Sequence, residues 1–271
     1  MSTEAVTENH NGPGGKLVEE TGAGERVIRV HGGGAAGLDA WRAQLGLAAR
    51  YRLVIPTRLG YPGSETTARE DFDVDAPLLA ELLGSGAHLV GHSYGAVGAM
   101  LAAAMRPEAV RSLTVIDAAC SGVARGDAVV DAHEAQMQAV VASPPANPGA
   151  FVRAVFAVID SKITLPDPLP PSFAAFGQRL KTLRWPWEAV IPLDALRATT
   201  FPKLVVSGGR NPLYEVISEV LETRLEAERF VIENAGHHFE NAAAALNDVT
   251  HQRRRDAPRA GSCPGFRPAS S

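Results

Sequence analysis

The chain has 271 residues, a mass of 28.6 kDa and a formal net charge of -4 at pH 7. Its 45% hydrophobic and 21% charged residues are typical of a soluble globular protein, which excludes collagen-like, coiled-coil and wholly disordered chains. A slightly acidic protein has no overall basic field to hold nucleic acid or an anionic membrane surface, so neither is expected as a partner. Cys120 and Cys263 are too few for a disulfide framework, and no cysteine or histidine cluster has zinc-site spacing. No metal or organic cofactor is expected.

The two ends of the chain lack hydrophobic periodicity. Residues 1–15 mix Gly, Asn, Glu and Pro, and residues 250–271 are rich in Arg, Pro and Ser, so both are predicted to be disordered tails. The start is polar and acidic where a secretory signal would be basic and then apolar. The longest apolar run, 96–105, is too short for a membrane span of about 20 residues. These features predict a cytoplasmic protein that does not bind a membrane.

Short runs rich in β-branched residues alternate with longer stretches whose apolar residues recur at helical spacing. This pattern is typical of a mostly parallel sheet with helices on its faces, so the chain is predicted to have an α/β fold. The strands are expected at 25–31, 52–55, 88–90, 111–117, 203–206 and 229–232, and the helices at 38–50, 75–83, 94–105, 214–224 and 239–249.

The alternation is interrupted once, between residues 120 and 197. This segment has no strand pattern, and it contains three helical stretches separated by the loops SPPANP (143–148) and TLPDPLPP (164–171). It is expected to be a helical insertion near the carboxyl ends of the strands. Residues 16–119 and 198–249 are then the two parts of the sheet-bearing core.

The strongest chemical motif is GHSYG at 91–95, which matches G-x-S-x-G. A strand is predicted before it and a helix of small residues after it. A serine at such a sharp strand-to-helix turn projects its hydroxyl from the sheet, and the two glycines remove side chains that would collide with neighbouring backbone. The motif therefore favours Ser93 as a nucleophile over the alternative that Ser93 only caps the helix.

A glycine-rich turn, HGGG at 31–34, ends an earlier predicted strand. Glycine lets backbone N–H groups approach a ligand closely. Together with the N–H of Tyr94, the N–H of Gly33 can form an oxyanion hole, with Gly34 as the alternative donor.

The same stretch also fits the dinucleotide-binding pattern G-x-G-x-x-G over residues 32–37. That interpretation requires an acid roughly 20 residues later, at the end of the next strand, where this chain has Thr57 and Arg58. Arg58 could accommodate a 2′-phosphate, so an NADP-dependent oxidoreductase remains a weaker alternative. It leaves the serine motif unexplained.

A histidine pair follows the last predicted strand, in the sequence AGHH at 235–238. A base placed there can reach over the serine turn, which completes a triad in the chain order serine, acid, histidine. His237 is the predicted base, and His238 is assigned to packing or to the surface.

With these motifs the chain resembles the α/β-hydrolase superfamily over residues 16–248. The resemblance implies an α/β-hydrolase fold in which the insertion after the sixth strand is a helical cap over the active site. It rests on the segments HGGG (31–34), RLGYPGS (58–64), GHSYGA (91–96), LTVIDA (113–118), LVVSGGRNP (204–212) and NAGHH (234–238).

The resemblance departs from the family pattern at the triad acid. Family members commonly place an Asp after the strand matching 203–206, where this chain has Asn211. An amide can hold an imidazole, but it cannot stabilise an imidazolium electrostatically. Some members take the acid from the end of the preceding strand, where this chain has Asp117. A buried carboxylate there needs a partner, so Asp117 is favoured as the acid over a triad without one.

These residues predict a serine hydrolase that cleaves a small ester, thioester or related acyl compound through an acyl-enzyme intermediate. Ser93 is the nucleophile, His237 the base and Asp117 the residue that orients it. Trp187 of the insertion is expected to contact the small-molecule substrate. The alternative from another class, motivated by Asn211, is an impaired member of the fold that binds a small molecule with little turnover. The sequence indicates no particular oligomeric state.

Overall fold

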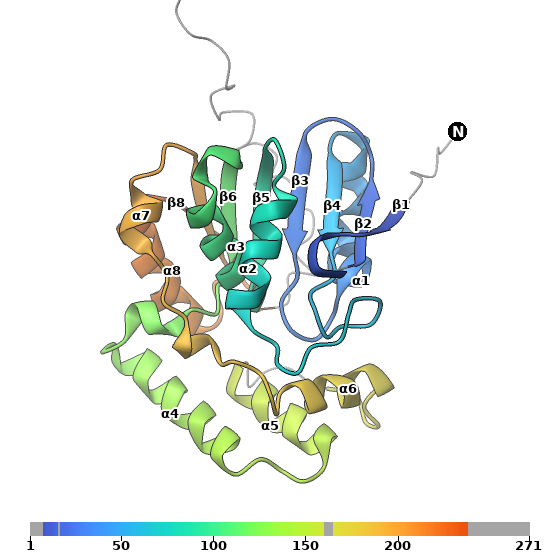
Figure 1. The fold of residues 1–271 in the computed structure, drawn as a ribbon. Helices are drawn as coiled ribbons and strands as arrows, with labels where there is room; N and C mark the ends of the chain where they lie inside the picture. The colour runs from blue at the N-terminus through green and yellow to red at the C-terminus, as the bar shows by residue number, and fades with distance from the viewer. Residues whose placement is uncertain (1–7, 16, 160–164, 238–271) are drawn as a thin grey trace, which may run out of the picture.

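The structure, a computed structural model, describes residues 8–15, 17–159 and 165–237. These residues form an eight-stranded sheet flanked by helices (Figure 1), which confirms the predicted α/β fold. In spatial order the strands are β1 (Glu8–Asn11), β2 (Leu17–Thr21), β4 (Arg52–Pro56), β3 (Arg26–Val30), β5 (Ala87–His92), β6 (Val110–Ile116), β7 (Lys203–Ser207) and β8 (Glu228–Val231).

The six strands β4, β3, β5, β6, β7 and β8 run parallel to one another, whereas β2 is antiparallel to both of its neighbours, β1 and β4. The prediction of a disordered tail over residues 1–15 is wrong for Glu8–Asn11, because this segment pairs with β2. All four of its residues are exposed. Backbone pairing and a 3.1 Å contact between His10 and Glu20 hold it, and neither leaves a hydrophobic pattern in the sequence.

The helices of the structure follow the predicted alternation closely, and several begin at a side-chain cap. Asp71 accepts a hydrogen bond from the N–H of Asp73 at the start of α2, and Asp127 does the same for Val129 at the start of α4, as expected of N-cap residues. The α-helices are α1 (Gly37–Trp41), α2 (Phe72–Leu82), α3 (Tyr94–Met105), α4 (Ala128–Ala142), α5 (Pro148–Ile159), α6 (Pro171–Arg179), α7 (Leu193–Arg197) and α8 (Pro212–Leu225).

Alternate residues of the central strands feed two cores, one on each face of the sheet. In β3, Ile28 packs into the core beneath α2, α3 and α8, whereas Val27 packs into the opposite core with Trp41. In β4, Val54 and Leu53 divide in the same way. This alternation follows from the two-residue period of a strand, and it explains why both faces of the sheet carry helices.

The segment between β6 and β7 forms the predicted helical insertion. Figure 1 shows α4, α5 and α6 as a layer at one end of the sheet. They share a core of their own, in which Met137, Phe151, Val155 and Phe176 are buried. The third predicted helical stretch is divided in the structure into α6 and the short helix α7, which packs against α3 and α8.

One predicted helix differs from the structure, and other predicted segments lie outside the described residues. The expected helix at 38–50 is split into α1 and a 3-10 helix, Arg42–Ala49, which contains Gly46, a poor helix former. The expected helix at 239–249, His238 and the tail at 250–271 lie outside the described residues. Within the described part of the chain, no helix is long and apolar enough to cross a membrane.

Candidate active site

Ser93 lies at the turn between β5 and α3, in a backbone conformation that is rare for a residue with a side chain. Its φ is 51° and its ψ is -122°, so the turn carries strain that the surrounding structure must offset. Its N–H donates to the carbonyl of Ile116 at 2.9 Å, and its own carbonyl accepts from Ala96 and Ala119. These bonds anchor the turn to α3 and to the end of β6.

The two glycines of the G-x-S-x-G motif lie where no side chain fits. A β-carbon at Gly95 would lie 2.3 Å from the carbonyl oxygen of His31, and one at Gly91 would lie 2.6 Å from the Cα of Ala96. Both contacts are with backbone, which cannot move aside as a flexible side chain can. The glycines therefore allow α3 to begin directly against β3 and β5, as the sequence predicted.

The structure brings Ser93, His237 and Asp117 together in one hydrogen-bonded chain. Nε2 of His237 lies 2.9 Å from Oγ of Ser93, and Nδ1 lies 3.2 Å from Oδ2 of Asp117. Because the carboxylate accepts at Nδ1, that nitrogen carries the proton of a neutral imidazole, and the Ser93 hydroxyl donates to Nε2. All three residues are buried.

Asp117 follows β6 directly and has a positive φ of 39°. Its N–H donates to the carbonyl of Val206, and its Oδ1 accepts from the N–H of Gly208 at 3.1 Å. One carboxylate oxygen is thereby held by the end of β7, and the other faces His237. The carboxylate favoured by the sequence thus has the partner that its burial requires.

Asn211, at the family's usual acid position, has a different task. Its Oδ1 accepts from the N–H of Leu213 as the N-cap of α8, and its Nδ2 donates to the carbonyl of Ile159. Both polar atoms of the amide are therefore engaged away from His237. Glu215, in the next turn, bonds to Ser207, Gly209 and Arg229, so it too is occupied elsewhere.

The glycine turn after β3 lies directly against Ser93. A β-carbon at Gly32 would lie 2.8 Å from the Cβ of Ser93. Gly33 and Tyr94 line the same cavity as Ser93, and the N–H of Tyr94, at the first position of α3, has no partner within the helix. Gly34 lines a second hollow and is not among the described residues that line the Ser93 cavity. This placement favours Gly33 over Gly34 as the N–H donor to an oxyanion at Ser93.

A buried ionic network supports the glycine turn from behind. The Arg58 guanidinium bonds to Asp75 at 2.8 Å, to Glu70 at 2.7 Å and to the carbonyl of Gly32 at 3.2 Å. The N–H of Arg58 also donates to Nε2 of His31. Burial alone lowers the pKa of Arg58, but the two carboxylates raise it well above its usual value.

The same network bears on the NADP alternative. Arg58 is 1% exposed, and all three guanidinium nitrogens are bound within the protein. It is therefore not placed to receive a 2′-phosphate. Among the described residues, no group of three or more His, Cys, Asp or Glu side chains is arranged to hold a metal ion.

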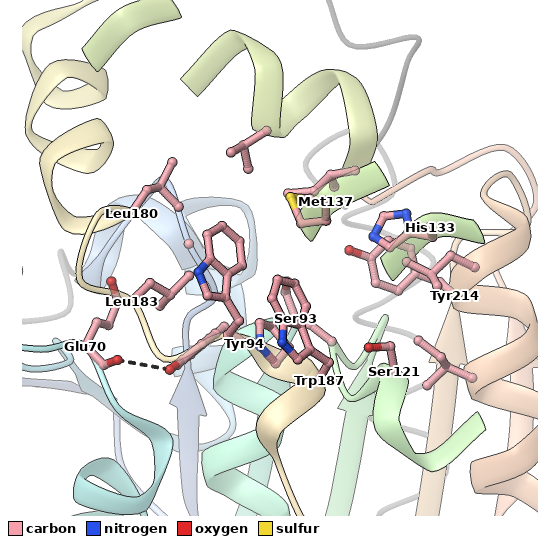
Figure 2. A pocket seen from close by; sticks show the side chains of 18 of the residues that line it. Glu70, Ser93, Tyr94, Ser121, His133, Met137, Leu180, Leu183, Trp187 and Tyr214 are labelled. Atoms are coloured by element: carbon pink, nitrogen blue, oxygen red, sulfur yellow. Dashed lines mark hydrogen bonds between the residues drawn. The ribbon is translucent and has the colours of Figure 1, made fainter. Parts of the chain in front are cut away.

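A cavity of about 100 Å³ opens above Ser93. Figure 2 shows Ser93 at its floor, with Glu70, Leu180 and Leu183 on one side and His133 and Tyr214 on the other. The predicted contact residue Trp187 lines it, stacked on Trp185 with ring centroids 5.0 Å apart. Residues of α4, α5 and α6 form much of the remaining wall.

The cavity is almost free of charge. Among its described lining residues, Glu70 alone carries a formal charge at neutral pH, and it is paired with Arg58 and Arg179. Burial lowers the pKa of His133 to about 4, so its imidazole is neutral there. The other lining side chains are apolar or hydroxyl-bearing.

Sequence reasoning missed several of the polar lining residues, among them His133 and Tyr214. His133 lies one helical turn before Met137, which also lines the cavity. Residues four apart share a helix face, so this spacing is a signal that could have found His133. Tyr214 has no such signal, because it reaches the site through the packing of α8 against the loop after β8.

Comparisons with known proteins agree with the fold. Residues 30–249 match the family described as the alpha/beta hydrolase family. The thermophilic esterase of Thermogutta terrifontis superimposes with a TM-score of 0.68 and 21% identity, covering 93% of this chain and 99% of that one. The meta-cleavage product hydrolase CumD of Pseudomonas fluorescens IP01 superimposes with a TM-score of 0.69 and 18% identity, covering 95% and 100%.

Two relatives are similar in sequence over shorter stretches. A protein of Azorhizobium caulinodans, provisionally named the carbamate hydrolase RutD, is 32% identical over 153 residues, which are 54% of this chain and 54% of that protein. The pimeloyl-(acyl-carrier protein) methyl ester esterase of Methylococcus capsulatus is 36% identical over 106 residues, 38% of this chain and 40% of that protein. The matches span about half or less of these relatives. The family match, by contrast, covers most of this chain, and the protein therefore belongs to the alpha/beta hydrolase family.

Proposed function

We propose that the protein is a serine hydrolase that cleaves an ester, thioester or related acyl compound through a covalent acyl-enzyme. The observation that carries the proposal is the hydrogen-bonded chain from Ser93 through His237 to Asp117. A hydroxyl becomes a nucleophile when an adjacent base takes its proton and a third group orients that base. The names of the two sequence relatives, both hydrolases, support the same reaction class.

The proposed reaction begins when Oγ of Ser93 attacks the substrate carbonyl carbon while its proton moves to Nε2 of His237. Asp117 stabilises the imidazolium through Nδ1–H, and the N–H groups of Gly33 and Tyr94 hold the oxyanion. The bond to the leaving group then breaks, and Nε2 returns the proton to that group. Water attacks the acyl-enzyme by the same steps, which release the acid and restore Ser93.

The cavity supports a neutral, apolar acyl group as the substrate's acyl part. An acyl group with a carboxylate would be desolvated there with no cation to pair with it among the described residues of the wall, which is costly. We therefore propose that Trp187 and its neighbours contact a short uncharged chain.

Turnover of p-nitrophenyl esters tests both proposals. p-Nitrophenyl butyrate should be hydrolysed with a burst of nitrophenol, and intact-mass analysis should trap an adduct of one butyryl group that is absent in Ser93→Ala. The anionic mono-p-nitrophenyl succinate should have a kcat/KM lower by roughly tenfold or more. Equal values for the two esters would refute the neutral-acyl proposal, and no butyrate turnover with no adduct would refute the hydrolase.

A further inference from the structure

The ring of Tyr214 stacks on the imidazole of His237. The two ring centroids are 4.3 Å apart and the planes are 8° from parallel. The Tyr214 hydroxyl lies 3.4 Å from Nε2 of His237, the same nitrogen that accepts from Ser93. Tyr214 is 3% exposed, so the two rings meet inside the protein and are shielded from water.

The position of Tyr214 at the start of α8 determines that its ring contacts His237. Tyr214 lies in the first turn of α8, three residues after Asn211, which caps that helix. The first turn of α8 thus presents an aromatic face to His237, while the carboxylate comes from Asp117, directly after β6.

Three other described residues lie near His237. Asp117 meets Nδ1 at the edge of the imidazole, and His92 lies 5.0 Å away with its rings tilted by 40°. Nε2 of His92 is 3.0 Å from the backbone carbonyl of His237 and not from its ring. The Arg210 guanidinium lies over Gly236, one residue earlier in the chain. Among the described residues, Tyr214 supplies the parallel stacked ring.

We infer that Tyr214 is a positioning residue for His237. The aromatic face of Tyr214 stabilises the imidazolium that His237 becomes when it takes the proton of Ser93. This inference rests on the proposed function. The face of an aromatic ring is negative, and a cation within about 6 Å of its centroid is attracted to it, most strongly where both are desolvated. Tyr214 gains and loses no bond in the reaction: the proton passes from Oγ of Ser93 to Nε2 of His237.

The effect on acidity has a definite sign. A ring that favours the imidazolium makes His237 a stronger base, so replacing the ring makes His237 lose its proton at lower pH. Ser93 reacts only when His237 is neutral. The midpoint of the acid limb in a plot of reaction rate against pH should therefore fall, by about half a unit to one unit. The plateau rate should also fall, because a weaker base removes the proton less effectively.

The experiment measures the rate at which a fluorophosphonate labels Ser93 from pH 5 to pH 9, by intact-protein mass spectrometry. The variants are Tyr214→Phe, which keeps the ring and loses the hydroxyl, and Tyr214→Leu, which loses both. Tyr51→Leu is the matched control, because Tyr51 is also a buried tyrosine but packs in the core on the far face of the sheet. Thermal unfolding reports the stability of each variant.

Tyr214→Phe should keep the wild-type midpoint and a plateau within about threefold, whereas Tyr214→Leu should shift the midpoint down and lower the plateau by about tenfold. Tyr51→Leu should leave the midpoint unchanged. Pentafluorophenylalanine at position 214 provides a second test if Tyr214→Leu does not fold. It keeps the size of the ring but withdraws the negative charge from its face, so it should shift the midpoint as Tyr214→Leu does.

Two results would overturn the inference. A midpoint unchanged in both Tyr214→Leu and the pentafluorophenylalanine protein would reduce Tyr214 to packing, and a loss in Tyr214→Phe equal to that in Tyr214→Leu would assign the effect to the hydroxyl. Failure of the proposed function is a different outcome, because the folded wild-type protein would then not be labelled at all.

Discussion

Oδ2 of Asp117 lies 3.2 Å from Nδ1 of His237, although the two residues are 120 positions apart in the chain. Parallel strands place their carboxyl ends at one edge of a sheet, and Asp117 follows β6 there just as Ser93 follows β5. Because the proposed acid follows β6, the start of α8 does not have to supply it. Asn211 then caps the helix, and Tyr214 packs on the proposed base.

Replacing Asn211 separates its capping role from any role in the triad. Asn211→Ala should lower the free energy of unfolding by about 1 kcal/mol, because the N–H of Leu213 loses its acceptor, with no change in the rate of Ser93 labelling. Urea unfolding and fluorophosphonate labelling measure the two effects. Asn211→Asp keeps the cap and should not accelerate labelling. A labelling rate that rises with the carboxylate would show that position 211 still acts on His237.

Replacing Gly95 tests the close approach of α3 to β3. In Gly95→Ala the new β-carbon meets the carbonyl of His31, so the free energy of unfolding should fall by about 3 kcal/mol. Gly98 lies in the same helix, where a β-carbon would lie 3.3 Å from the movable end of Leu79 and 3.6 Å from Cβ of Asp75, an ordinary van der Waals distance. Gly98→Ala should therefore be close to neutral. Equal losses in the two variants would indicate a general intolerance of α3 to added volume.

Arg58→Met leaves Glu70 and Asp75 buried without their main cation. Removing one partner of a buried ion pair costs about 3 to 5 kcal/mol of stability. The exposed pair of Arg42 and Asp39 provides the control, because Arg42→Met should cost less than about 1 kcal/mol. Chemical denaturation measures both. A loss of unfolding free energy in Arg58→Met as small as that in Arg42→Met would contradict the role of the Arg58 network in supporting the glycine turn.

His133 should make the protein less stable as the pH falls. Burial lowers its pKa to about 4 in the folded protein, against about 6.5 in an unfolded chain. Between these two pH values the unfolded state binds more protons, so stability is lost as the pH falls from about 6.5 to about 4, by at most about 3 kcal/mol. The melting temperature of His133→Leu should depend less steeply on pH in this range than that of the wild-type protein. Parallel curves would refute the assignment.

Much of this site could be predicted from the sequence because its signals are local. The G-x-S-x-G motif specifies a turn within five residues, and the structure has that turn at Ser93. Asp117 and His237 could be proposed because each follows a predicted strand, and the carboxyl ends of parallel strands meet at one edge. The structure brings these two residues to Ser93.

The remaining features depend on contacts between distant segments. In the sequence, Tyr214 is one apolar position of a predicted helix. Only the packing of α8 places its ring against His237. β1 was missed because its four exposed polar residues carry no alternating pattern. Both cases belong to tertiary structure, which overrides what a short stretch of sequence indicates.

The most direct test of the central claim is the rate of labelling by a fluorophosphonate in the wild-type protein, Ser93→Ala and Asp117→Asn. A single adduct is expected in the wild-type protein and none in Ser93→Ala. In Asp117→Asn labelling should slow by a factor on the order of 10³ to 10⁴, because an amide does not stabilise the imidazolium. Equal labelling of Asp117→Asn and the wild-type protein would contradict the assigned triad, and no adduct in the folded wild-type protein would contradict the hydrolase itself.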